Sequence, residues 1–134
     1  MRPIRALISL ALLGIAAGCG GGGGDGGGPT AGVLNVTLNT PTTGDGAVLF
    51  RITGGPVDSV VKGAMAASFS SHKVANTTRI VAAGPITDGV IAHLYVSDVS
   101  KASSYVGTME QVAANSNFAQ RSVTGYTLTI TAAP

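Results

Sequence analysis

The stretch GAVLFRIT, residues 46–53, alternates apolar side chains with other residues, which is typical of a half-buried strand. Successive side chains of a strand point to opposite sides, so Val48, Phe50 and Ile52 would share one face. The preceding TPTTGDG, residues 40–46, supplies turn residues. The stretch therefore predicts one strand of a sheet that covers a hydrophobic core.

The same pattern recurs on both sides of this stretch and predicts several more strands. They are VLNVTLN (33–39), VDSVVK (57–62), TTRIVAAG (77–84), GVIAHLYV (89–96), YVGTMEQVAA (105–114) and GYTLTITA (125–132). Seven to nine short strands separated by turns predict an all-β fold with a single antiparallel β-sandwich, Ig-like or jelly-roll, over residues 33–134.

Details within these segments can also be predicted. In 89–96 we expect Val90, Ala92, Leu94 and Val96 on one face, and Ile91, His93 and Tyr95 on the other. In 125–132 we expect Tyr126, Leu128 and Ile130 to be buried. GAMAASFSS, residues 63–71, fits either a helix or an edge strand. SDVSKASSY, residues 97–105, is expected to hold one helical turn capped by Ser97 or Asp98.

The amino-terminal residues follow the order of a secretory signal. Two arginines precede the apolar run ALISLALLGIAA, residues 6–17, and small residues follow it. As a helix this run would span about 18 Å, which is short of the roughly 30 Å hydrocarbon core of a bilayer. Residues 1–18 are therefore predicted to be a signal peptide rather than a transmembrane span.

IAAGC, residues 15–19, resembles the lipobox of bacterial lipoproteins, in which small residues precede a cysteine that receives lipid on its sulfur. The resemblance implies cleavage between Gly18 and Cys19 and lipidation of Cys19, with Ala16 standing where leucine is most common. No second cysteine is present for a disulfide. Two or three acyl chains on one residue hold a protein stably at a membrane. Gly20 after the cysteine implies sorting to the outer membrane in a cell with two membranes.

Residues 19–32 are rich in glycine and are predicted to form a flexible tether after Cys19. Glycine loses the most backbone entropy on ordering, and this segment has almost no side chain to bury in return. Its root-mean-square span would be about 20 Å. The predicted organisation is thus a signal peptide (1–18), a lipidated tether (19–32) and a β-sandwich domain (33–134).

The β-rich part also resembles a known class of module. GAVLFRITGGPVDSVV, residues 46–61, and ITDGVIAHLYV, residues 86–96, are similar to strands of cohesin-type β-sandwiches. This resemblance implies a jelly-roll module that contacts protein or carbohydrate rather than a catalyst. It transfers no binding residue to this chain.

The charge of the chain argues against a nucleic-acid partner. The chain has eight basic and six acidic residues, but Arg2 and Arg5 lie in the predicted signal peptide. The six cations that remain are balanced by six acids and lie singly along the sequence. Such a pattern offers no basic stripe for phosphates and few aromatic side chains for stacking on bases.

The sequence has few residues of the types that catalyse reactions or bind metal ions. His72 and His93 lack the spacing of a zinc site, and His93 is expected to be an outward or half-buried strand residue. Asp45 and Asp88 stand beside glycines and are expected to serve turns rather than a calcium site. No glycosylation is expected at the N-x-T triplets that begin at Asn35 and Asn76.

Two S-x-x-K segments, Ser59 to Lys62 and Ser70 to Lys73, lack the helix and the companion motifs of serine acyl enzymes. The sequence thus predicts a non-catalytic envelope lipoprotein that has a binding or structural role and no cofactor or metal. The alternative is a small hydrolase-like envelope enzyme whose site is assembled only by the fold.

Overall fold

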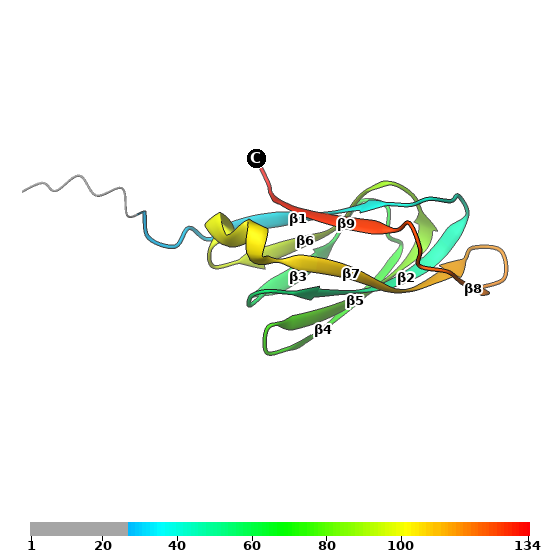
Figure 1. Ribbon diagram of the computed structural model, residues 1–134, viewed down its shortest axis with the longest axis horizontal. Helices are drawn as coiled ribbons and strands as arrows, with labels where there is room; N and C mark the ends of the chain where they lie inside the picture. The colour runs from blue at the N-terminus through cyan, green and yellow to red at the C-terminus, as the bar shows by residue number, and fades with distance from the viewer. Residues whose placement is uncertain (1–26) are drawn as a thin grey trace, which may run out of the picture.

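The computed structural model describes residues 27–134 (Figure 1). The predicted signal peptide, Cys19 and most of the predicted tether lie outside these residues. The described elements are β1 (Gly32–Asn39), β2 (Asp45–Thr53), β3 (Ser59–Lys62), β4 (Ser68–Val74), β5 (Thr77–Ile86), β6 (Gly89–Val96), the 3-10 helix η1 (Val99–Ser104), β7 (Val106–Ala114), β8 (Gln120–Arg121) and β9 (Thr127–Ala132).

The strands form two antiparallel sheets that pack face to face. One sheet has the order β3-β6-β1-β9, and the other has the order β4-β5-β2-β7-β8. We call them the four-stranded and the five-stranded sheet. The two layers are visible in Figure 1, with β2 and β7 below β1 and β9. The predicted antiparallel β-sandwich is confirmed.

The core lies between the sheets and follows the alternation read from the sequence. Val48, Phe50 and Ile52 of β2 are buried, as predicted, while Leu49 and Arg51 between them are only half-buried. The opposite sheet contributes Leu34, Val36 and Leu38 of β1 and Ala92, Leu94 and Val96 of β6, all buried. Each valine, leucine, isoleucine or phenylalanine side chain among them contributes about 1.5–3 kcal/mol when fully buried, so this alternation stabilises the fold.

A β-bulge corrects one predicted face of β6. Val36 pairs with Ala92 but Thr37 pairs with Val90, so Ile91 is an extra residue in the ladder. Ile91, which was expected on the face of His93 and Tyr95, is completely buried, whereas Val90, which was expected to share a face with Ala92, lies opposite Thr37. The bulge shifts the side-chain alternation by one residue, and a simple period of two cannot anticipate that shift.

Three other segments can be compared with the predictions made from the sequence. The segment 63–71, which fitted either a helix or an edge strand, leads into the edge strand β4. The predicted helical turn after β6 is η1, and Asp98 is its N-cap because its carboxylate accepts a hydrogen bond from Ser100 N at 3.1 Å. The hydroxyl of Ser100 also donates to Asp98 and is the main cause of a lowered pKa for this carboxyl. The two-residue strand β8 was not predicted.

Residues 27–31 enter the sandwich at the end that carries η1 (Figure 1). Val99 N donates to Thr30 O at 2.8 Å, and β1 begins at Gly32, so the last residues of the predicted tether are fixed to the domain. The carboxyl terminus lies at the same end, where Ala133 N donates to Val33 O. The opposite end, which we call the far end, carries β8.

Candidate functional site

A trough of about 350 Å³ crosses the outer face of the five-stranded sheet. Its floor includes Ala47 and Ala113, which pair with each other and have small side chains. Ala83 pairs with Ala47 on the other side and extends this row of small residues onto β5. Polar residues end the row, because Ser68 pairs with Ala83 on β4 and Gln120 pairs with Ala113 on β8. Small side chains flanked by larger ones leave a hollow in an otherwise even sheet surface.

One wall of the trough is the next row along the strands. Leu49 of β2 pairs with Val81 of β5 and with Gln111 of β7, so these three side chains share the outer face. Val81 is 45% exposed although it is a large aliphatic residue. The wall thus combines apolar surface with one amide that can both donate and accept hydrogen bonds.

Phe118 forms the other wall from the loop between β7 and β8. Its side chain is 68% exposed, the largest exposed fraction among the large hydrophobic residues in 27–134. Its backbone has φ of 55°, a left-handed conformation that glycine or asparagine adopts more readily than an aromatic residue. Hydrogen bonds from Phe118 N to Ala114 O and from Ala114 N to Ala119 O hold the loop in this shape. An exposed aromatic residue in a strained backbone conformation is a feature that clusters at ligand sites.

A charged row borders the apolar wall on the side nearer η1. Arg51 of β2 pairs with Arg79 of β5, which in turn pairs with His72 of β4. The register of β7 shifts between the partners of Leu49 and Phe50, so Glu110 is an extra residue there. Glu110 lies 3.2 Å from Nε of Arg79 and 3.6 Å from Nη1 of Arg51. The bulge therefore places one carboxylate between two guanidinium groups.

Asp45 is not a turn residue as predicted; it is the first residue of β2 and is 1% exposed. Its two carboxylate oxygens accept hydrogen bonds from Arg121 Nη1 and from the Tyr126 hydroxyl, each at 2.8 Å. Because Tyr126 donates its only hydroxyl proton to Asp45, the Thr42 hydroxyl at 2.9 Å donates to Tyr126. A buried charge needs such partners, and no turn motif could have revealed them. The cluster fixes β8, and with it the loop that carries Phe118.

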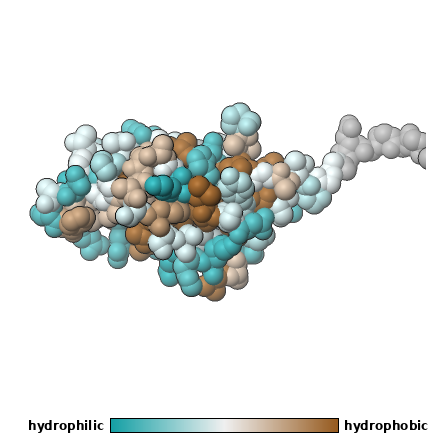
Figure 2. Space-filling view, turned by 180° about the vertical axis from the view of Figure 1, so that it is seen from behind, coloured by the Kyte–Doolittle hydropathy of each residue, from teal (hydrophilic) through white to brown (hydrophobic). Residues whose placement is uncertain are grey.

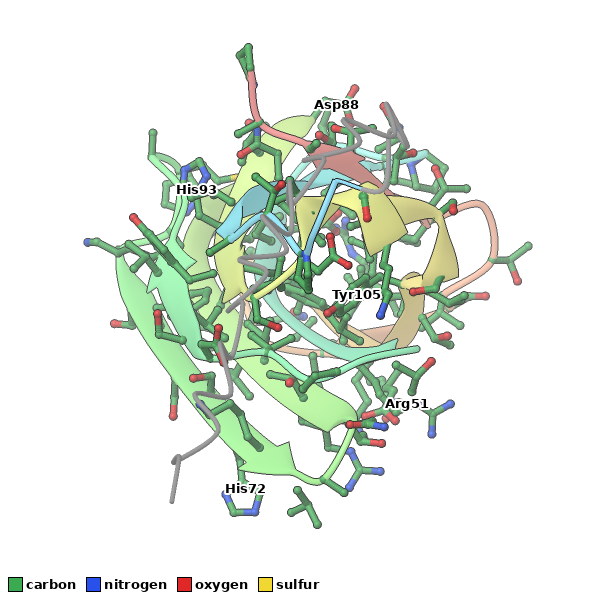
Figure 3. All side chains as sticks on the ribbon, turned by 90° about the vertical axis from the view of Figure 1, so that its left-hand side faces the viewer. Arg51, His72, Asp88, His93 and Tyr105 are labelled. Atoms are coloured by element: carbon green, nitrogen blue, oxygen red, sulfur yellow. The ribbon has the colours of Figure 1, made fainter. Side chains whose placement is uncertain are left out.

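The remaining polar residues do not converge on the trough. His93 is half-buried in β6, as predicted, and its Nδ1 lies 2.8 Å from Oδ1 of Asn35. Asp88 lies in the loop before β6 and accepts a hydrogen bond from Thr40 N at 2.6 Å. Figure 3 looks along the long axis and shows His72 and His93 on different sides of the molecule. The described residues therefore contain no hydrogen bond between a histidine and a carboxylate.

Both S-x-x-K segments lie in strands, which separates serine from lysine. Ser59 and Lys62 belong to β3, and Ser70 and Lys73 belong to β4, so the two side chains of each pair point to opposite sides. Lys73 donates instead to the carbonyl oxygens of Val57 and Asp58 and closes one side of the sandwich. Across residues 27–134, no three His, Cys, Asp or Glu side chains gather as a metal site.

Comparison with protein-family models, with curated proteins and with solved structures finds no significant match to this chain. Among the described residues, no helix has the length and apolar character needed to cross a membrane. Seen from the side opposite to Figure 1, the surface is a mixture of hydrophobic and hydrophilic residues, and neither kind covers the whole face (Figure 2).

The buried carboxylate makes a prediction about stability. We expect Asp45→Ala to lower the free energy of unfolding by about 3 kcal/mol, because it leaves Arg121 and Tyr126 without their partner in a largely buried site. Asp88→Ala is the matched control and should cost about 1 kcal/mol or less, since Asp88 is exposed and accepts one hydrogen bond. Urea unfolding measures both values. Equal losses in the two variants would contradict a special role for Asp45.

The same cluster predicts a loss of stability at alkaline pH. Burial, followed by the neighbouring Asp45, raises the pKa of Tyr126 above its ordinary value of 10.0. The unfolded chain therefore loses this proton first as the pH rises, so the contribution to stability is present below pH 10 and is lost above it. The free energy of unfolding, followed from pH 8 to 11.5, should fall less steeply for Tyr126→Phe. Part of the slope should remain, because burial also raises the pKa of Tyr105. Identical slopes would rule out this assignment.

Proposed function

We propose that this protein is an envelope lipoprotein whose β-sandwich is a non-catalytic binding module. The order of charged, apolar and small residues before Cys19 supports the lipid anchor. The trough with the exposed, strained Phe118 supports the binding role, and it is the single observation that carries it. In a cell with two membranes, Gly20 favours the outer one.

The position of the trough fits such an anchor. The chain enters the domain at the end that carries η1, whereas β8 and the Phe118 loop lie toward the far end (Figure 1). The ten residues between Cys19 and Thr30 would give about 17 Å of slack. A lipid on Cys19 would therefore leave the trough turned away from the membrane surface and accessible to partners.

The anchor predicts a specific biochemical result. Cys19→Ser should abolish labelling of the protein with palmitate and leave an unprocessed precursor, because the sulfur that accepts the lipid is gone. The measurement is metabolic labelling followed by gel electrophoresis. Undiminished labelling and processing of the variant would show that Cys19 is not the lipidated residue.

The binding role predicts where partners contact the domain. A photo-reactive residue at Gln111, which lines the trough, should form covalent adducts in intact cells that are detected by mass. The matched control is Thr129, an exposed residue of β9 on the outer face of the four-stranded sheet, and it should form few adducts. Equal adduct formation at both positions, or none at Gln111, would argue against the trough as the binding surface.

A further inference from the structure

Arg51 has more hydrogen-bonding capacity than its neighbours use. Its Nε is buried and has no hydrogen-bond partner among residues 27–134. Its nearest acidic contact is Glu110, at 3.6 Å from Nη1, which is too long for a hydrogen bond. The side chain is still 39% exposed. The buried Nε is out of reach of a ligand, but the exposed part of the Arg51 side chain is not, and a guanidinium group is the preferred side chain for carboxylates.

The charges around Arg51 sum to a positive value. Glu110 of β7 is the one carboxylate in contact with Arg51, and Arg79 of β5 already takes both of its oxygens, at 3.2 and 3.4 Å. Two guanidinium groups that share one carboxylate leave a net charge of +1. The charged row therefore favours an anion over a cation or a neutral group.

The charged row and the trough lie on one face, so one ligand can reach both. Arg51 and the floor residue Ala47 are four residues apart on β2, which is about 13 Å along a strand. A ligand that reaches both needs a negative charge at one end and an apolar face about 13 Å away. Gln111 and Gln120 offer amide donors and acceptors beside the apolar floor.

A glycan fits this surface better than a polypeptide does. The floor is the face of a sheet, where the backbones of β2, β5 and β7 are already paired with one another, so a peptide that lay over the floor would find no free backbone groups there. Its amide groups would lie unpaired over alanine, leucine and valine. A sugar ring has an apolar face of C–H groups that can pack on Phe118, and hydroxyl groups at its rim that glutamine amides bind.

We propose that the trough and the charged row bind an acidic glycan, a chain of pyranose rings that carry carboxylates. The rings would pack along Phe118 and the alanine floor, and one carboxylate would accept hydrogen bonds from Arg51. This inference rests on the proposed binding role of the trough and adds the class of ligand.

The test is a titration of the full chain, purified in detergent micelles, with tetragalacturonate as the probe. The methyl ester of tetragalacturonate has the same rings without the charges. We expect the ester to bind at least about tenfold more weakly, because it cannot accept a charge-assisted hydrogen bond from Arg51. Arg51→Gln should weaken binding of tetragalacturonate to a similar extent, and Glu110 keeps its contacts with Arg79 in that variant. Lys62→Gln, an exposed cation on β3, is the matched control and should bind within about twofold of the original protein.

Phe118→Gly separates binding from folding. Glycine relieves the left-handed backbone conformation, so the midpoint of thermal unfolding should not fall, while binding of tetragalacturonate should weaken by about tenfold. If Arg51→Gln and Phe118→Gly bind tetragalacturonate as tightly as the original protein does, the proposed site is wrong. Binding of hexaglutamate as tight as that of tetragalacturonate, or no binding of tetragalacturonate, would overturn the glycan assignment. Adducts from Gln111 in intact cells would then still support a binding module with another ligand.

Discussion

Val48, Phe50 and Ile52 of β2 pack against the four-stranded sheet, and this requirement determines what the intervening residues can do. A strand has two faces, so filling the core with every second residue sends Leu49 and Arg51 to the outer face of the five-stranded sheet. The large apolar residues on the inner face of β2 are buried in the core. The other face carries the residues that the core does not need, among them Leu49 and Arg51, which stay half-buried.

The outer face of the five-stranded sheet departs from an ordinary solvated surface in three respects. It has a row of alanines where larger polar residues would be expected, an aromatic side chain in a strained loop, and an arginine without a full set of partners. Each feature costs stability or solubility, and none of them helps to build the core. Asp45 is the support for this arrangement, because its bonds to Arg121 and Tyr126 hold β8 and the adjoining loop. A buried carboxylate at the far end thus positions a surface feature two strands away.

The strands could be predicted from the sequence because period-two alternation and turn residues are local signals. The helical turn capped by Asp98 was predictable for the same reason. The bulge at Ile91 and the partners of Asp45 were not, since both depend on residues distant in sequence. The trough also needs the register of four strands, and no single strand reveals that Ala47 lies beside Ala113. Only the alternation within β2 pointed to this face, and it gave no indication of the hollow.

We propose that the outer face of the five-stranded sheet, rather than any other surface, is where this protein meets its ligand. Backbone amide NMR of the isotope-labelled protein, recorded while tetragalacturonate is added, tests it most directly. We predict that the signals that shift are those of Ala47, Gln111 and Phe118, while those of His93 and Tyr95 on the other sheet stay in place. Shifts confined to His93 and Tyr95 would contradict the claim.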